Sequence, residues 1–411
     1  MSALPLWLFV SYGGGHVKAL LPVARRVREF GIAQPLYLAL TTAAPIVREA
    51  GLPVIGFADL VTDADGEALR KGEELAAALA VRTADHAESV AYLGLSYVDL
   101  AQRVGPEQAQ RLHAEFGRQA FLPLGVLARA VQRFRPSLVV ATNSPRAEQA
   151  ALQVACQLDV ASVCLVDLLA IWERDRLAAP DYADAVCVLN EAVRDRLVSA
   201  GRPPQDVRVT GNPAFDTILD PSVIAAGADL RRDAGWEGLH VLLYASSPEP
   251  ATYPGSSARG DPAFPRRIER ALLEAVLANP SLALWVRRHP SEPPASELAA
   301  LGHPRIRVSS VEMPLHACIH ASDEVVVTVS TVGVEATLAG KAVTQVRGSM
   351  FDDLSPYLAM GIAQRELTLE QMEAGFAPAD RAQAVRGRQA GAPATDRVVE
   401  VLASVQAARG R

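Results

Sequence analysis

The chain opens with a strand, a run of glycines and a helix, and this order restricts its first domain to α/β folds. The apolar run Leu4–Val10 ends at Ser11-Tyr12-Gly13-Gly14-Gly15-His16, and a helical pattern follows over Val17–Phe30. Glycines allow backbone angles that other residues avoid, and the helix behind them offers unpaired N–H groups and a positive dipole end. The turn therefore predicts a site for an anionic or sugar-bearing ligand. It lacks the G-x-G-x-x-G spacing of dinucleotide-binding turns, and a turn without a ligand is the alternative.

Short apolar runs alternate with longer helical patterns along the whole chain, as in doubly wound parallel sheets. With 411 residues, the chain exceeds the size at which one hydrophobic core stops growing. We therefore expect an α/β protein with two Rossmann-like domains, 1–220 and 221–411, that face each other across a cleft. A helical insertion at about 63–129 belongs to the first domain. The final helix, expected over 394–408, could cross back onto the first domain.

The expected strands share a short apolar core bounded by turn residues. In the first domain they are Leu4–Val10, Pro35–Leu40, Val54–Phe57, Leu138–Thr142, Ser162–Val166, Ala185–Leu189 and Val207–Thr210. In the second domain they are Leu239–Ala245, Leu282–Arg287, Ile306–Val308, Glu324–Val329 and Ala342–Val346.

Charge and hydropathy narrow the possible partners. The formal net charge is −6, with acids and bases interspersed, which offers no basic face for nucleic acid. We see neither a signal-peptide pattern nor an apolar run long enough to span a bilayer, so a cytoplasmic protein is expected. Peripheral contact with the inner face of the membrane stays open, through Trp7 or a helix face near Leu20 and Leu21. The four cysteines lack metal-ligand spacing and are expected to be buried thiols.

A second strand-to-helix turn lies in the second domain, where Val326–Val329 leads into Ser330-Thr331-Val332-Gly333. Two hydroxyl groups and free backbone N–H groups at a helix N-terminus suit a diphosphate, and Gly333 would let the phosphate approach. Glu335 could accept hydrogen bonds from a ribose diol. An ordinary capping box, in which a Ser or Thr is followed by Glu335 a few residues later, is the alternative.

A third polar segment, Arg288-His289-Pro290, ends the expected strand Leu282–Arg287. Doubly wound sheets bind their ligands at the carboxyl ends of strands. His289 could donate to a phosphate oxygen, with Arg287 or Arg288 adding positive charge. Ser246 and Ser247 form a polar turn after another strand of this domain and are further donor-site candidates.

At this point the chain resembles a known superfamily. The opening turn with His16-Val17 and Leu21-Pro22 resembles the glycine-rich loop of GT-B glycosyltransferases. Val209–Asp216, which reads VTGNPAFD and contains Asn212, is similar to the hinge shared with UDP-N-acetylglucosamine 2-epimerases. Ser330–Ala336 resembles the SGG-x-QEE element of those epimerases, and Arg288-His289-Pro290 resembles a motif of capsule-polysaccharide transferases. The resemblance implies a GT-B fold in which the C-terminal domain binds the nucleotide-sugar donor and the N-terminal domain binds the acceptor.

Departures from the epimerase pattern favour sugar transfer over epimerisation. Epimerases begin with GTRPE-x-IK, whereas this chain has the glycine turn before His16. Their GD acid after the Leu138 strand is replaced by Thr142-Asn143-Ser144, and their second Glu in QEE is Ala336. Epimerisation requires acids and bases to remove and return the proton at C2, and few of them remain.

Transfer requires a base for the acceptor hydroxyl, and His16 is the leading candidate because the histidine of similar GHV turns often plays this part. His16 could instead cap the helix or contact the donor sugar. Asp167 and Glu173 are the alternative bases. The charge of the leaving group is expected to be stabilised without metal by the Ser330 turn and His289.

The sequence thus predicts a metal-independent glycosyltransferase that uses a nucleotide-sugar, most readily a UDP-sugar, in bacterial surface polysaccharide or glycoconjugate synthesis. The acceptor would be a glycan, a lipid-linked molecule or a small molecule. A UDP-N-acetylglucosamine 2-epimerase, hydrolysing or not, is the alternative enzyme. A nucleotide-sugar-binding protein without catalysis is the alternative outside enzymes.

Overall fold

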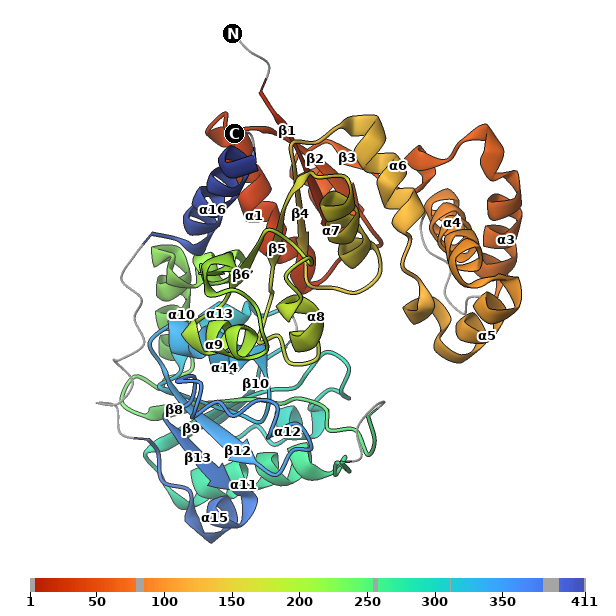
Figure 1. Ribbon diagram of the computed structural model, residues 1–411. Coiled ribbons are helices and arrows are strands. Elements are labelled where there is room, and N and C mark those ends of the chain that lie inside the picture. The colour runs from red at the N-terminus through yellow and green to blue at the C-terminus, as the bar shows by residue number, and fades with distance from the viewer. Residues whose placement is uncertain (1–3, 79–84, 254–257, 311, 380–391, 410–411) are drawn as a thin grey trace. The chain divides into compact units, whose positions relative to one another are not determined.

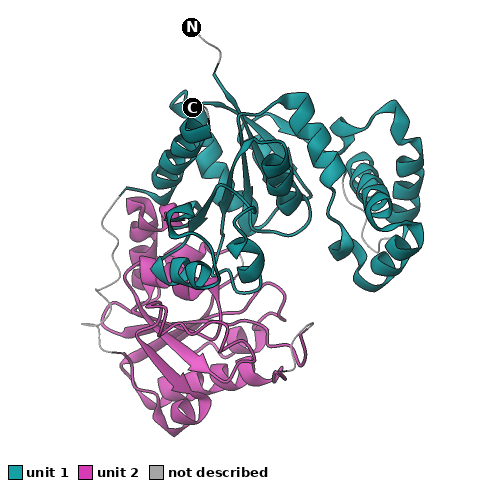
Figure 2. Cartoon of the chain, viewed as in Figure 1, with its two compact units in different colours: residues 1–214, 392–411 teal, residues 215–391 magenta. Residues whose placement is uncertain are grey.

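The computed structural model describes residues 4–78, 85–253, 258–310, 312–379 and 392–409, and the chain forms two compact units. Unit 1 comprises residues 1–214 and 392–411, and unit 2 comprises residues 215–391 (Figure 2). The units divide between Ala214 and Phe215, slightly before the expected boundary at 220. Residues 392–411 accompany unit 1, so the range 221–411 does not form one compact unit.

Unit 1 is built on a parallel seven-stranded sheet in the order β3-β2-β1-β4-β5-β6-β7 (Figure 1). Its strands are β1 (Leu6–Ser11), β2 (Gln34–Ala39), β3 (Val54–Ile55), β4 (Leu138–Thr142), β5 (Ala161–Leu165), β6 (Ala185–Val188) and β7 (Val207–Val209). Its helices are α1 (Gly15–Glu29), α2 (Ala43–Glu49), α3 (Gly66–Ala77), α4 (His86–Val104), α5 (Pro106–Phe116), α6 (Leu124–Phe134), α7 (Ala147–Gln157), α8 (Arg174–Ala178), α9 (Glu191–Ser199) and α16 (Ala394–Arg409). Helices α3 to α6 occupy the sequence between β3 and β4, where the insertion was expected.

The last helix, α16, packs on unit 1, as the sequence suggested. Val398 and Leu402 of α16 are fully buried in one core with Trp7 and Leu20. The indole Nε1 of Trp7 donates a hydrogen bond to Oε1 of Gln406 at 3.1 Å. Trp7 and Leu20 are therefore unavailable for the membrane contact that the sequence left open, because both side chains are used to dock α16, and Leu21 packs against the same core.

Unit 2 has a parallel six-stranded sheet in the order β10-β9-β8-β11-β12-β13. Its strands are β8 (His240–Ala245), β9 (Leu282–Arg287), β10 (Ile306–Val308), β11 (Glu324–Val327), β12 (Ala342–Arg347) and β13 (Arg365–Thr368). Its helices are α10 (Pro221–Asp233), α11 (Phe264–Ala278), α12 (Ser296–Ala300), α13 (Leu315–Ala321), α14 (Thr331–Leu338) and α15 (Leu369–Gly375).

Strand β13 was not expected from the sequence. It reads Arg-Glu-Leu-Thr and lies at the edge of the sheet, where polar residues are tolerated. Arg365 pairs with the fully buried carboxylate of Glu324 at 2.7 Å, and Glu366 lies 3.6 Å from Arg347. Charge pairing with inner strands therefore replaces the apolar run that identifies a strand.

Among the described residues, no helix is long and apolar enough to cross a membrane. All four cysteines carry free thiols; Cys164, Cys187 and Cys318 are buried, and Cys156 is partly exposed.

Candidate functional site

Each sheet reverses its strand order next to its first strand, and the candidate residues gather there. In unit 1, β1 lies between β2 and β4; in unit 2, β8 lies between β9 and β11. Ligands of doubly wound sheets bind at such switch points, beyond the carboxyl ends of the strands. His16 follows β1 and Thr142 ends β4, while Ser246 follows β8 and Ser330 follows β11.

The glycine turn after β1 is closely packed and leaves the start of α1 open. Helix α1 begins at Gly15, and Gly14 before it has φ 68° and offers no side-chain cap. A Cβ atom at Gly13 would collide with the side chain of Thr42, so a larger residue there would force Thr42 to shift. The turn thus presents uncapped N–H groups beside His16, the second residue of the helix.

His16 lies between two carboxylates of unit 1. Its Nδ1 atom is 2.8 Å from Oγ1 of Thr142, whose hydroxyl donates to Oε2 of Glu148. The same Nδ1 lies 3.6 Å from Oδ2 of Asp167. The His16 side chain is 25% exposed and that of Glu148 is 0% exposed, so the imidazole joins a buried acid to the surface.

Glu148 is the functional candidate that sequence reasoning missed. It lies in the first turn of α7, and its Oε1 accepts from the backbone N–H of Tyr12 at 2.6 Å. Its Oε2 accepts from the Ser144 N–H at 3.2 Å as well as from Thr142. Burial raises the pKa of Glu148, while the positive charge of His16 and these hydrogen bonds act in the opposite direction.

The direction of these hydrogen bonds sets the tautomer of His16. An ionised carboxylate only accepts hydrogen bonds, so the single hydroxyl proton of Thr142 points to Glu148. The Thr142 oxygen then accepts from Nδ1–H of His16, and Asp167 favours the same protonated Nδ1. Nε2 therefore carries the lone pair, and no hydrogen bond of the described residues engages it. This is the arrangement that a general base requires.

The loop after β5 positions Asp167. Its backbone N–H donates to Oδ1 of Asn143 at 3.0 Å, and its carbonyl accepts from Nδ2 of Asn212 at 2.6 Å. Asn212, a donor-site candidate, thus fastens the loop of a candidate base in unit 1. Glu173 stands immediately before α8, and none of the interactions found for the described residues joins it to His16. Burial raises its pKa.

In unit 2, the ends of β8 and β9 meet around Glu292, which the sequence did not single out. The hydroxyl of Ser246 donates to Oε1 of Glu292 at 3.0 Å, and the N–H of His289 donates to Oε2 at 2.8 Å. Arg266 pairs with the same carboxylate. The backbone N–H of Ser291 points to Nδ1 of His289 at 3.2 Å, so a neutral His289 carries its proton on the exposed Nε2 and can donate to an anion.

The arginines beside His289 already have partners. Arg288 pairs with Glu269 at 2.7 Å and with Glu297, and its side chain is 8% exposed. Arg287 donates to Oγ of Ser309 at 2.7 Å and to the carbonyl of Met313 at 2.8 Å. Arg288 also donates to the carbonyl of Pro294 at 3.0 Å and so braces the loop that carries His289 and Pro290. Ser247 follows Ser246 on the loop after β8.

The turn after β11 has the expected strand-to-helix form. Ser330 caps α14, with its Oγ 3.3 Å from the N–H of Val332, and its carbonyl accepts from the Tyr357 hydroxyl at 2.8 Å. Thr331 is the exposed first residue of the helix. A Cβ atom at Gly333 would press on the ring of Tyr357, at 3.1 Å.

Glu335 does not close a capping box with Ser330. Its Oε2 lies 2.8 Å from Nε2 of His316. His320, one helical turn further on, instead lies 2.6 Å from the carbonyl of Ile218. The two histidines therefore have separate partners, and the described residues contain no group of three metal-ligating side chains.

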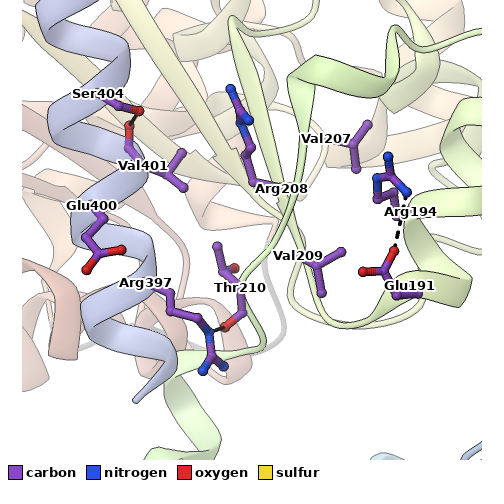
Figure 3. Close-up of a pocket in the computed structure, with 10 residues that line it drawn as sticks. All are labelled: Glu191, Arg194, Val207, Arg208, Val209, Thr210, Arg397, Glu400, Val401 and Ser404. Atoms are coloured by element: carbon purple, nitrogen blue, oxygen red, sulfur yellow. Dashed lines mark hydrogen bonds and ion pairs between the residues drawn. The ribbon is translucent and has the colours of Figure 1, made fainter. Parts of the chain in front are cut away.

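A separate groove of about 620 Å³ runs along the edge strand β7 between α9 and α16 (Figure 3). Arg194 pairs with Glu191 at 3.4 Å, and Nε of Arg397 donates to the carbonyl of Thr210 at 2.8 Å. None of the candidate residues lines this groove. The Arg397 bond ties α16 to the residue after β7, whereas the Arg194–Glu191 pair lies within α9.

Comparison with known proteins shows similarity in structure alone. No family model matches the sequence, and a search of curated proteins finds no match. The structure of Staphylococcus aureus MnaA with UDP is 13% identical, with a TM-score of 0.56, over 96% of this chain and 95% of that one. The Neisseria meningitidis UDP-GlcNAc 2-epimerase bound to UDP-GlcNAc is 12% identical, with a TM-score of 0.57, over 97% and 100% of the two chains.

The UDP-GlcNAc 2-epimerase of Methanocaldococcus jannaschii is 11% identical, with a TM-score of 0.55, over 97% and 99% of the chains. These similarities extend over nearly the whole length of both proteins and confirm the expected fold of two Rossmann-like domains. This chain therefore has the GT-B-like fold of the UDP-N-acetylglucosamine 2-epimerases.

Proposed function

We propose that this chain is an enzyme that acts on a UDP-activated sugar and that His16 is the residue that moves a proton. The observation that carries the proposal is the chain His16–Thr142–Glu148, which directs the lone pair of the imidazole to Nε2. A buried acid that fixes the tautomer of a partly exposed histidine is the usual support of a general base. The choice of a UDP-sugar is supported by the UDP and UDP-GlcNAc bound in proteins of the same fold.

The first candidate reaction is epimerisation at C2 of UDP-N-acetylglucosamine. It requires removal of the C2 proton, departure of UDP as the C1–O bond breaks, and return of a proton to the opposite face of C2 before UDP adds again. The sequence alone identified few of the acids and bases that this reaction requires. Glu148 adds a carboxylate beside His16 and Asp167, and the shared fold supports the same reaction.

The second candidate is glycosyl transfer, with His16 deprotonating an acceptor hydroxyl. It is favoured by the departures of the sequence from the epimerase pattern, among them Asn143 after β4 in place of an acid. Asn143 binds the backbone of Asp167, so this position holds a loop rather than supplying a proton.

Incubation with UDP-N-acetylglucosamine in D₂O, without acceptor, separates the two reactions. Epimerisation is expected to place deuterium at C2 and to produce the C2 epimer, both visible by NMR. Transfer is expected to leave C2 protonated and to release UDP only when an acceptor is added. If neither deuterium exchange nor transfer to a panel of acceptors occurs while UDP still binds, the enzymatic proposal is wrong and a binding protein remains.

The nucleotide is expected at the Ser330 turn of unit 2. Ser330→Ala should raise the Kd for UDP about tenfold, because one hydrogen bond to a charged phosphate is lost. Calorimetry with UDP provides the measurement. Ser404→Ala on α16 is the matched control and should leave the Kd unchanged. Equal affinity of Ser330→Ala and wild type would remove this turn from the nucleotide site.

A further inference from the structure

The loop that carries Asp167 also presents an exposed tryptophan. Trp172 is 52% exposed, whereas the other three tryptophans, Trp7, Trp236 and Trp285, are 0%, 1% and 5% exposed. It lies between β5 and α8, five residues after a carboxylate that is 3.6 Å from His16. A large aromatic ring in water is unfavourable and marks a candidate contact surface.

Hydrogen bonds anchor the loop on both sides of Trp172. Asn143 fastens both ends, since its Oδ1 accepts from Asp167 N–H at 3.0 Å and its carbonyl accepts from Nη2 of Arg176 at 2.7 Å. Nη1 of Arg196 donates to the carbonyl of Leu169 at 3.1 Å. Ala170 has φ 50°, a conformation that a residue with a Cβ adopts at a cost.

These features combine an exposed ring, a fixed loop and neighbouring carboxylates. A pyranose ring has an apolar face of C–H bonds, which packs on an aromatic face, and a rim of hydroxyl groups, which carboxylates bind. Asp167 and Glu173 lie on the same loop as Trp172. A nucleobase would also stack, but the two carboxylates on this loop favour a ligand rich in hydroxyl groups.

We infer that Trp172 is the stacking platform for the pyranose ring of the sugar substrate. The inference rests on the proposed function and extends it, because it names the residue that recognises the sugar rather than the nucleotide. The sugar can be the one carried by UDP or a free acceptor sugar.

Tryptophan fluorescence tests the inference directly, because the three other tryptophans are buried and Trp172 supplies the emission that acrylamide can quench. Wild-type protein is titrated with UDP-N-acetylglucosamine, with UDP and with N-acetylglucosamine. We expect UDP-N-acetylglucosamine, but not UDP, to protect Trp172 from acrylamide. Protection by N-acetylglucosamine alone would assign the platform to an acceptor sugar and also supports the inference.

Calorimetry with variants separates recognition of the sugar from recognition of the nucleotide. Trp172→Ala should weaken binding of UDP-N-acetylglucosamine about tenfold, leave UDP affinity unchanged and be partly rescued in Trp172→Phe. If protection comes from N-acetylglucosamine alone, the tenfold loss is expected for that sugar instead. Phe30→Ala is the matched control, since Phe30 is a 64% exposed aromatic residue at the far end of α1 from His16.

The outcomes distinguish the two claims. If wild type binds a sugar ligand, but Trp172 is not protected and Trp172→Ala binds it equally well, the platform is refuted and the proposed function stands. If wild type binds neither UDP nor any of the sugars, both fail.

Discussion

Replacing His16 with alanine is expected to lower kcat by about 10²–10⁴-fold, the usual contribution of a general base. Among the described residues around Thr142 and Glu148, the imidazole of His16 alone offers a nitrogen with a free lone pair, and its side chain is 25% exposed. The Asp167 side chain is 17% exposed, and it lies beside Nδ1 of His16 and not beside the free Nε2. The Kd for UDP should change little, because the expected nucleotide contacts lie in unit 2.

The measurement is kcat with UDP-N-acetylglucosamine, with an acceptor where one is required, together with calorimetry of UDP binding. His86→Ala is the matched control: His86 is 66% exposed, pairs with Glu73 at 2.9 Å and lies on α4. It should retain wild-type turnover. Retained turnover in His16→Ala would disqualify His16 as the base.

Much of the fold was predictable because several inner strands, such as β4, are apolar along nearly their whole length. Residues Leu138–Thr142 are buried along their whole length, so the apolar run and the strand have the same bounds. Segments stabilised by pairing between charges escape this rule, as β13 does. The sequence could not decide whether Trp7 contacts lipid. Its packing partner is a helix whose Gln406 lies 399 residues further along the chain.

The site was predictable only where a single segment carries the signal. His16 follows a glycine turn, and Ser330 caps a helix after a buried strand; both features are local. Glu148 has an unremarkable local context, since an acid in the first turn of a helix is common. Its part in the site depends on the Tyr12 N–H, 136 residues away, and on the ends of β1 and β4 lying side by side. No short motif records such a contact.

The protonation state of Glu148 decides which nitrogen of His16 carries the proton. When the carboxyl is protonated, its proton faces the Thr142 oxygen, and Thr142 must turn its own proton to Nδ1 of His16. The imidazole then carries its proton on Nε2 and loses the lone pair needed there. The same reversal follows from any neutral donor at this position.

Glu148→Gln is therefore expected to lower kcat by about 10²–10³-fold while the protein stays folded, because its amide N–H₂ group reverses the Thr142 hydroxyl. The amide oxygen can still accept from Tyr12 N–H, and the bond that is lost is the longer one from Ser144 N–H, at 3.2 Å. Glu88→Gln is the matched control: Glu88 also accepts two backbone N–H bonds, at 2.8 and 2.9 Å, its pKa is also raised by burial, and it lies away from His16 on α4. Glu88→Gln should keep wild-type turnover.

Glu148→Gln is expected to lose turnover but to gain stability relative to wild type as the pH rises. Burial raises the pKa of Glu148 in the folded chain above its ordinary value of 4.5, so the folded state holds this proton more tightly than the unfolded state. The contribution of the group to stability is thus complete below pH 4.5 and declines as the pH rises through the raised pKa. Glutamine has no such decline. In urea unfolding series, the variant should therefore gain stability relative to wild type as the pH rises towards neutral. A constant difference in stability across that range would show that the pKa of Glu148 is not raised in the folded protein. Wild-type turnover in Glu148→Gln would show that the carboxylate does not set the tautomer of His16.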